Sequence, residues 1–333
     1  MSRQGAFILG CAGPQLTPEE RAFFARVQPW GFILFARNVD TPDQLRALTA
    51  DLRDAVGRDV PVFIDQEGGR VARLRAPYWR EWLPALDQVA QNKRHAVRAM
   101  YLRYRLIADE LRAVGIDGNC APLADVATPD THEILRNRCY GEDAVRVAEI
   151  AASVAQAHVD GGVLPVLKHI PGHGRATADS HLELPHVKAR MRALKWSDFL
   201  AFEALNWLPL GMTAHVVFDA LDDERCATIS PTMIDLIRTR IGFDGCLMSD
   251  DISMQALDGP LALRSRAALA AGCDLILHCN GEMAEMAEVA DASGWLDGAA
   301  QTRADKALEW RRAPTPIDIA AAEAEFQSLM QGG

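Results

Sequence analysis

The chain has 333 residues and a net charge of −10, and 49% of its residues are hydrophobic. This balance is typical of a globular protein with enough apolar material for a sizeable core. The acidic charge argues against nucleic acid as the main partner, because neutralising phosphates requires a basic face. No apolar run approaches the roughly 20 residues that span a bilayer, so no membrane association is expected.

The cysteines indicate the compartment. The seven of them are odd in number and scattered, and they form no Cys-x-x-Cys pair, which indicates reduced and mostly buried thiols in a cytoplasmic protein. The apolar stretch before Cys11 is too short for a secretory signal, whose apolar region runs about 7–15 residues. A first strand is the better interpretation of that stretch.

Apolar runs typical of strands alternate with helical segments along the whole chain. They are continuous rather than alternating in polarity, which indicates strands buried on both faces, as in a parallel sheet. Eight such runs are found, at residues 6–12, 31–35, 60–64, 119–123, 163–167, 211–217, 245–248 and 273–279. Eight strand–helix units predict an α/β fold, a single (β/α)8 TIM-like barrel that takes in residues 1–333 as one domain.

Several helix starts are marked by their first residues. Thr17 and Thr41 each precede a Pro, with Glu or Gln three residues later, which is the pattern of a capping box. Ser230-Pro231 and Thr315-Pro316 predict two further starts. Helices are expected at residues 18–27, 42–56, 91–114, 143–160, 196–206, 231–240, 260–271 and 282–291, with two more packed outside the barrel within 300–330.

Polar residues gather where the predicted strands end. They are Asp65, Asp125, Lys168-His169, His215, Asp250-Asp251 and Asn280. Catalytic groups of (β/α)8 enzymes sit at the carboxyl-terminal ends of the strands, so this distribution supports a barrel. A doubly wound sheet would instead need a glycine-rich nucleotide turn after its first strand, which Pro14 interrupts.

Asp250 and Asp251 are adjacent, so only one of them can face the barrel axis if the strand continues. An inward Asp250 could be a nucleophile, a metal ligand or an acid/base group. For Asp251 the favoured interpretation is the N-cap of a following helix.

The stretch 168–181 concentrates three His, an Asp, a Lys and an Arg. Asp179 could pair with His181 and raise the pKa of its imidazole, which would give a proton donor near neutral pH, although a solvated loop with an incidental pair is an alternative. His169 and His173 have a metal-ligand spacing, but Pro171-Gly172 between them prevents a helix, which makes a metal site the weaker hypothesis. His173 could instead hold the loop.

A third group is Asp65 with the glycine turn that follows it and two arginines. Asp accepts hydrogen bonds from vicinal sugar hydroxyls, and Arg and Lys anchor hydroxyls or carboxylates. The alternative is a salt bridge at the barrel rim, from Asp65 to Arg70 or Arg73.

Together these motifs resemble glycoside hydrolase family 3. Lys168-His-Ile-Pro-Gly-His-Gly174 with Asp179-Ser-His181, Asp65-Gln-Glu-Gly-Gly-Arg70 and Met248-Ser-Asp-Asp-Ile-Ser-Met254 are similar to the NagZ-type bacterial β-N-acetylglucosaminidases of peptidoglycan recycling. The resemblance spans about residues 5–280. It implies a retaining exo-β-N-acetylglucosaminidase (a β-N-acetylhexosaminidase) that removes terminal GlcNAc from GlcNAc-1,6-anhydroMurNAc and its peptides, without metal or other cofactor, as a monomer or weak homo-oligomer.

The resemblance also implies roles for individual residues. Asp250 would be the nucleophile, and His181 the proton donor and acceptor with Asp179 as its partner. Substrate-binding residues would be Asp65, Arg73, Arg138, Lys168 and His169. Arg138 departs from the family pattern in its neighbours, and Arg136 could take its place.

Alternatives remain at this point. One is another β-glycosidase or a β-N-acetylglucosaminide phosphorylase, because a neutral His repels phosphate less than a carboxylate does. Another is a metal-dependent hydrolase on the same barrel. Gly172 and Gly174 are expected to form a hinge that brings the loop toward the nucleophile.

Overall fold

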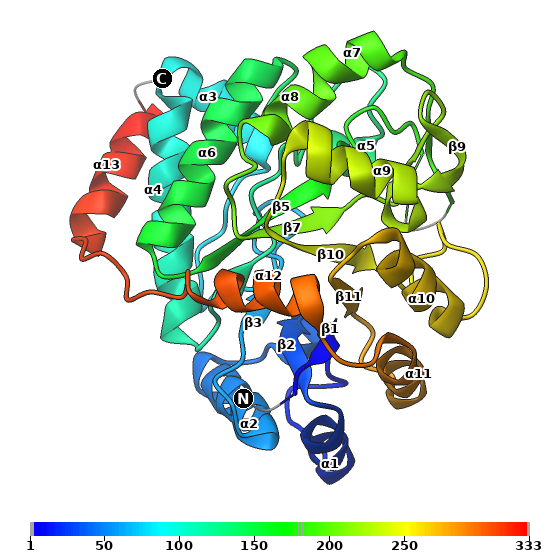
Figure 1. The fold of residues 1–333 in the computed structure, drawn as a ribbon. Coiled ribbons are helices and arrows are strands. Elements are labelled where there is room, and N and C mark those ends of the chain that lie inside the picture. The colour runs from blue at the N-terminus through cyan, green and yellow to red at the C-terminus, as the bar shows by residue number, and fades with distance from the viewer. Residues whose placement is uncertain (1–2, 179, 181–182, 332–333) are drawn as a thin grey trace.

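The computed structural model describes residues 3–178, 180 and 183–331, and its centre is a closed barrel of eight parallel strands (Figure 1). Around the barrel the strands follow the order β1-β11-β10-β7-β5-β4-β3-β2. Their bounds are β1 (Gly5–Leu9), β2 (Pro29–Leu34), β3 (Val62–Ile64), β4 (Gly118–Asn119), β5 (Leu164–Ile170), β7 (Leu210–Thr213), β10 (Cys246–Asp251) and β11 (Leu275–His278). The predicted barrel is confirmed, and each of its eight strands overlaps a predicted run, although β4 shares only Asn119 with the run 119–123.

One predicted strand was too long. The run 211–217 divides, because β7 ends at Thr213 and the chain then enters β8 (Val217–Phe218). This strand pairs with β6 (His186–Val187) and β9 (Asp222–Cys226) in a small sheet outside the barrel. Both segments are apolar and buried, so the sequence pattern alone does not separate them.

Helices surround the barrel close to the predicted positions. The helices α1 (Pro18–Val27) and α2 (Pro42–Val56) match the predicted bounds, and α6 (Ala144–Asp160), α10 (Leu261–Ala271) and α11 (Met283–Ser293) differ by one or two residues. A short helix α5 (Glu133–Arg136) was not predicted.

Two predicted helices are interrupted, and a third changes its helical geometry. Residues 91–114 divide into α3 (Ala85–Asn92) and α4 (Ala96–Ala113), because Lys93 has a φ of 45° and breaks the helix. Residues 196–206 are covered by α7 (Met191–Trp196) and α8 (Asp198–Glu203). The helix α9 (Pro231–Leu236) continues as a π-helical turn to Ile241.

The capping predictions have mixed outcomes. Thr17 and Glu20 form the full capping box, and Ser230 accepts from the backbone N–H of Met233 at 3.1 Å. The Gln44 side chain, by contrast, accepts from Asp40 N rather than from the N–H of Thr41. The predicted start at Thr315-Pro316 is wrong: α13 (Ile319–Gln331) begins later, and the Asp318 carboxylate accepts from Ala321 N.

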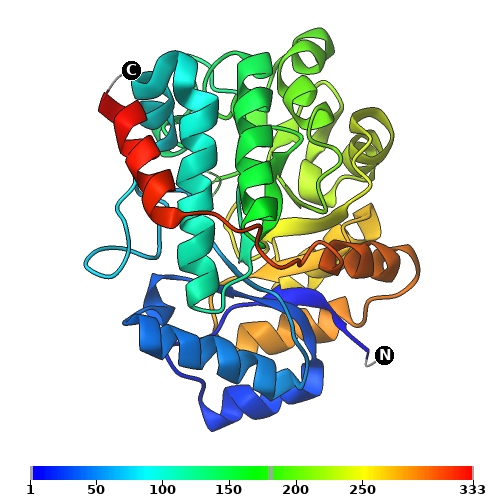
Figure 2. The ribbon, with the colours of Figure 1, turned by 90° about the vertical axis from the view of Figure 1, so that its left-hand side faces the viewer.

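The two predicted C-terminal helices are present, and they pack against different parts of the molecule. Figure 2 shows α13 beside α4. Phe326 of α13 also meets Trp82, from the segment before α3, edge to face. The helix α12 (Gly298–Leu308) packs Ala304 and Ala307 against the apolar interior of the barrel, where Ala6 and Cys246 lie near the starts of their strands. It therefore closes the amino-terminal end, which leaves the carboxyl-terminal end for a site.

No helix in the described part of the chain is both long and apolar enough to cross a membrane. All seven cysteines are buried and free of disulfides, as predicted.

Candidate active site

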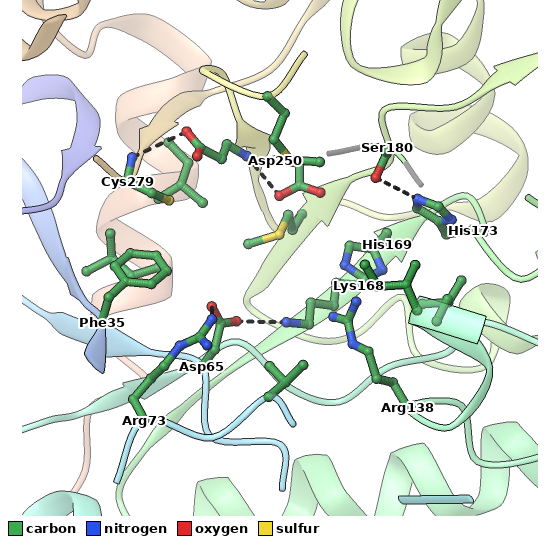
Figure 3. Close-up of a pocket in the computed structure, with 18 of the residues that line it drawn as sticks. Phe35, Asp65, Arg73, Arg138, Lys168, His169, His173, Ser180, Asp250 and Cys279 are labelled. Atoms are coloured by element: carbon green, nitrogen blue, oxygen red, sulfur yellow. Dashed lines mark hydrogen bonds and ion pairs between the residues drawn. The ribbon is translucent and has the colours of Figure 1, made fainter. Parts of the chain in front are cut away.

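A cavity of about 370 Å³ opens at the carboxyl-terminal ends of the strands (Figure 3). Small-molecule sites typically measure roughly 300–1,000 Å³. Its floor is the upper apolar layer of the barrel, formed by Ile33, Met212 and Leu277. Its polar lining comes from Arg37, Asp65, Arg70, Arg73, Arg138, Lys168, His169, His173, Ser180, Asp250, Asp251 and Asn280.

Asp250 faces this cavity from the end of β10. It continues the inward alternation of Cys246 and Met248, which belong to the apolar interior, so the prediction that Asp250 points inward is confirmed. Its Oδ1 accepts from the N–H of Asp251 at 2.8 Å. Burial raises the pKa of Asp250, but His215, His169 and this N–H outweigh burial, so the pKa lies below its ordinary range. The carboxyl group is therefore ionised at neutral pH.

Asp251 is not the helix N-cap that was predicted. Its carboxylate accepts from Ser253 N at 3.1 Å and Ser253 Oγ at 2.8 Å, and so organises the turn after β10, whereas α10 begins only at Leu261. The backbone carbonyl of Asp251 accepts from His215 Nε2 at 3.0 Å. Both contacts fix the strand end that carries Asp250.

A charged cluster lies across the cavity from Asp250. Lys168 Nζ is 2.9 Å from Asp65 Oδ1 and 2.7 Å from Glu67 Oε1. Arg73 Nη2 donates to Asp65 Oδ2 at 3.2 Å, which decides between Arg70 and Arg73 as the partner of Asp65. Arg138 binds Glu67 with two parallel hydrogen bonds of 2.8 and 2.9 Å.

Arg138, rather than Arg136, reaches the cavity. Arg136 donates to the carbonyl of Thr128 and to Glu142 Oε1, and is not part of the cavity lining. Although its neighbours in the sequence depart from the family pattern, Arg138 is thus the one placed to contact a ligand.

These groups keep each other ionised. Burial raises the pKa of Asp65, but the charges of Lys168 and Arg73 outweigh it and hold that pKa well below its usual range. Burial likewise opposes ionisation of Glu67, yet Arg138 and Lys168 lower its pKa to about 2. Burial lowers the pKa of Lys168, and Asp65 and Glu67 raise it above its ordinary value. The cavity thus offers fixed carboxylate and ammonium groups at neutral pH.

The stretch 168–178 is anchored on Asp125, at the end of the fourth predicted run. His169 Nδ1 donates to Asp125 Oδ2 at 2.7 Å, and the backbone N–H of His173 donates to Oδ1 at 2.6 Å. Burial and the nearby His169 lower the pKa of His173 to about 4, so this ring is neutral at pH 7. Its Nε2 is 3.1 Å from Ser180 Oγ. His173 holds the loop, as the sequence suggested.

The structure gives a packing reason for glycine at position 174, separate from the expected hinge. A Cβ there would lie 1.9 Å from the carbonyl oxygen of Val126, so only glycine allows the two backbones to approach. Asp179 and His181, the predicted acid/base pair, lie outside the described residues. Ser180 between them is described, and it is buried at the cavity edge.

Within the described ranges, no group of three or more His, Cys, Asp or Glu side chains is arranged to hold a metal ion.

Sequence reasoning missed the part played by Glu67. It lies in the quoted Asp65-Gln-Glu-Gly-Gly motif, and its position two residues after Asp65 was the available signal. Phe35 and Arg37 were also missed, although Phe35 ends the second apolar run. The ring of Phe35 stacks under the guanidinium groups of Arg37 and Arg73 at the cavity wall.

Comparison with known proteins shows the family of this chain. Residues 11–309 match the glycosyl hydrolase family 3 N-terminal domain. The chain belongs to glycosyl hydrolase family 3. The resemblance stated from the motifs is confirmed, and the chain is a glycoside hydrolase.

Curated relatives and solved structures agree. A Beta-hexosaminidase of Alkalilimnicola ehrlichii is 37% identical over 285 residues, which are 83% of this chain and 81% of that protein. A Beta-hexosaminidase of Pseudomonas aeruginosa is 36% identical over 280 residues, 83% of each. The crystal structure of NagZ from Neisseria gonorrhoeae in complex with N-trifluoroacetyl-D-glucosamine superposes with a TM-score of 0.84 at 28% identity, covering 99% of this chain and 97% of that one.

Proposed function

We propose that this family 3 hydrolase is a retaining exo-β-N-acetylglucosaminidase that removes terminal GlcNAc from peptidoglycan fragments, namely GlcNAc-1,6-anhydroMurNAc and its peptides. The observation that carries the proposal is the ionised Asp250 facing, in one cavity, the cluster of Asp65, Arg73, Arg138 and Lys168. A carboxylate across from a hydroxyl-binding wall suits attack on a sugar held by that wall. The names of the curated relatives and the glucosamine derivative bound by the gonococcal protein support GlcNAc as that sugar.

In the binding step the charged cluster across the cavity from Asp250 holds the sugar. Lys168 has three N–H donors, and two point at Asp65 and Glu67, so one remains for a sugar hydroxyl. Asp65 accepts hydrogen bonds from hydroxyls while Arg73 and Lys168 keep it ionised. His169, oriented by Asp125, presents its Nε2 from the same side.

The first chemical step is displacement at the anomeric carbon. Asp250 attacks C1, the bond from C1 to the glycosidic oxygen breaks, and His181 as imidazolium gives its proton to the leaving oxygen. The N–H of Asp251 holds Oδ1, which orients the nucleophilic carboxylate. The product of this step is a glycosyl ester on Asp250.

In the second step the proton moves in the opposite direction, toward His181. Neutral His181 takes a proton from water, the water oxygen bonds to C1, and the ester bond to Asp250 breaks. Asp179 stabilises the imidazolium in both steps. Two displacements at C1 restore the β configuration, so GlcNAc leaves with retention.

The proposed setting is the cytoplasm, with the protein as a monomer or weak homo-oligomer. Seven buried cysteines without a disulfide fit a reducing compartment. Recycled peptidoglycan fragments would be its substrates there.

The experiment is a comparison of substrates with product analysis. We expect release of GlcNAc from GlcNAc-1,6-anhydroMurNAc and from aryl N-acetyl-β-glucosaminides, with little action on aryl β-glucosides. The assay is repeated with inorganic phosphate, where the expected product is still GlcNAc. Equal rates on glucosides would overturn the specificity, and GlcNAc 1-phosphate as the main product would identify a phosphorylase instead.

A further inference from the structure

Glu67 lies behind the cavity wall rather than in it. Its side chain is 3% exposed, and it is not part of the cavity lining, whereas Lys168 and Arg138 are. One carboxylate oxygen, Oε1, accepts from Lys168 Nζ at 2.7 Å and from Arg138 Nη2 at 2.8 Å, and the other accepts from Arg138 Nε at 2.9 Å. A single buried carboxylate therefore joins the two cations that face a ligand.

The backbone fixes this carboxylate from both sides. The N–H of Glu67 donates to the carbonyl of Val71 at 2.9 Å, and its own carbonyl accepts from Tyr104 Oη at 3.2 Å and from buried Arg103. Gly68 follows with a φ of 104°, and a Cβ there would meet Arg103 and Trp82. The Glu-Gly turn is thus built into the core.

We propose that Glu67 is a positioning residue for substrate: it holds Lys168 and Arg138 side by side with their remaining donors directed at the sugar. The proposal rests on the proposed function of the cavity. Glu67 occupies the Nε–Nη2 edge of Arg138. The remaining nitrogen, Nη1, donates to no group in the described ranges and is therefore left for a ligand. It also shares Lys168 with Asp65, so that Asp65 is not the sole counter-ion of Lys168 and can accept from hydroxyls.

The charges of Lys168 and Arg138 explain why a carboxylate is needed at position 67. Lys168 and Arg138 are buried like charges that repel each other, and the negative charge between them offsets that repulsion. The ionisable groups that act most on Lys168 are Asp65 and Glu67, which favour its charged form, Arg138, which opposes it, and the Cys120 thiol. Asp250 and Tyr104 also interact with its charge. Without the Glu67 charge, Lys168 would lose its proton at a lower pH and Arg138 would turn toward other acceptors.

The test uses Glu67→Gln, which keeps the shape and removes the charge, and Glu67→Asp, which keeps the charge on a shorter chain. The matched control is Glu110→Gln, because Glu110 is a largely buried carboxylate bound to Arg80 at 2.7 Å on the outer helix α4. We measure kcat and KM on an aryl N-acetyl-β-glucosaminide and the inhibition constant of N-acetylglucosamine.

For Glu67→Gln, KM and the inhibition constant should both rise roughly tenfold or more, since charge-assisted hydrogen bonds to the sugar lose their geometry. Glu67→Asp should recover part of the affinity, and Glu110→Gln should change neither constant.

Wild-type constants in Glu67→Gln would overturn the proposal, as would equal changes in Glu110→Gln. Should Glu67→Gln fail to fold, Glu67→Asp with wild-type KM and inhibition constant would overturn it. An inactive wild type would refute the proposed function instead. In that case the affinity for N-acetylglucosamine, measured by calorimetry, still decides, and an equal affinity in wild type and Glu67→Gln would refute the positioning role.

Discussion

The two ends of the barrel carry the same residue types in opposite arrangements. At the amino-terminal end, Asp117 is fully buried, and its oxygens accept from the Val62 N–H at 2.8 Å, from Arg53 at 3.1 Å and from Arg311 at 2.8 Å. These donors come from a strand, from α2 and from the C-terminal segment. The carboxylate thus ties three parts of the chain together and is saturated by them.

At the carboxyl-terminal end the charges are not saturated in this way. Asp65 and Lys168 pair with each other and still line a cavity, and Asp250 accepts one hydrogen bond from the described part of the chain. The difference teaches that buried Asp–Arg contacts do not by themselves mark an active site. Asp117, Arg53 and Arg311 line a cavity as well, so what distinguishes the functional end is the donor and acceptor capacity that is left over there.

The sharpest contrast is expected from Asp250→Ala. Loss of the nucleophile should lower kcat on an aryl N-acetyl-β-glucosaminide by about four orders of magnitude or more, whereas the melting temperature should hardly change. Steady-state kinetics and thermal unfolding measure the two effects. Substantial remaining turnover would remove Asp250 from its proposed role.

A large effect is also expected for His181→Ala, and it should depend on the leaving group. With a phenyl leaving group, loss of the acid should cost roughly 10²- to 10⁴-fold in kcat. With dinitrophenyl, which departs without a proton, the first step should be far less affected. Equal losses for the two substrates would show that His181 is not the acid.

Asp117→Ala tests the structural end. Removing one partner of a buried charge network should cost about 3–5 kcal/mol of unfolding free energy, because Arg53 and Arg311 are left without their shared carboxylate. Activity per folded molecule should stay near that of the wild type. Denaturant unfolding and kinetics on the folded fraction distinguish this from a catalytic role.

At the functional end, the lowered pKa of Glu67 should make the stability of the protein depend on pH. The folded-state pKa of Glu67, about 2, lies below its ordinary 4.5, so its contribution is complete above pH 4.5 and declines as the pH falls toward 2. Urea midpoints from pH 6 to pH 2.5 should fall less steeply in Glu67→Gln. Burial raises the pKa of Glu110, so Glu110→Gln should not flatten the curve in this way.

The smallest effect is expected for Asp59→Ala. Asp59 binds the same two arginines as Asp117, but its side chain is 76% exposed. An exposed ion pair contributes about 0–1 kcal/mol, so the loss should be well below that of Asp117→Ala. A similar loss for both variants would mean that burial is not what separates them.

Much of the fold could be predicted from the sequence, since barrel strands are continuous apolar runs and the polar residues follow them. The break at Lys93 and the division of 211–217 could not, because they depend on local backbone geometry and on tertiary pairing rather than on periodicity. At the site, Asp250, Asp65, Arg73, Lys168 and His169 lie around one cavity, as expected. Glu67 was missed because its partners are distant in sequence and meet it only in the folded barrel.

The most direct measurement for the proposed mechanism is proton NMR of the first product formed from an aryl N-acetyl-β-glucosaminide. If Asp250 forms a glycosyl ester and water then displaces it, the β-anomer of GlcNAc must appear first and mutarotate slowly to the α-anomer. Initial formation of the α-anomer would contradict the covalent route and, with it, the role of Asp250 as nucleophile.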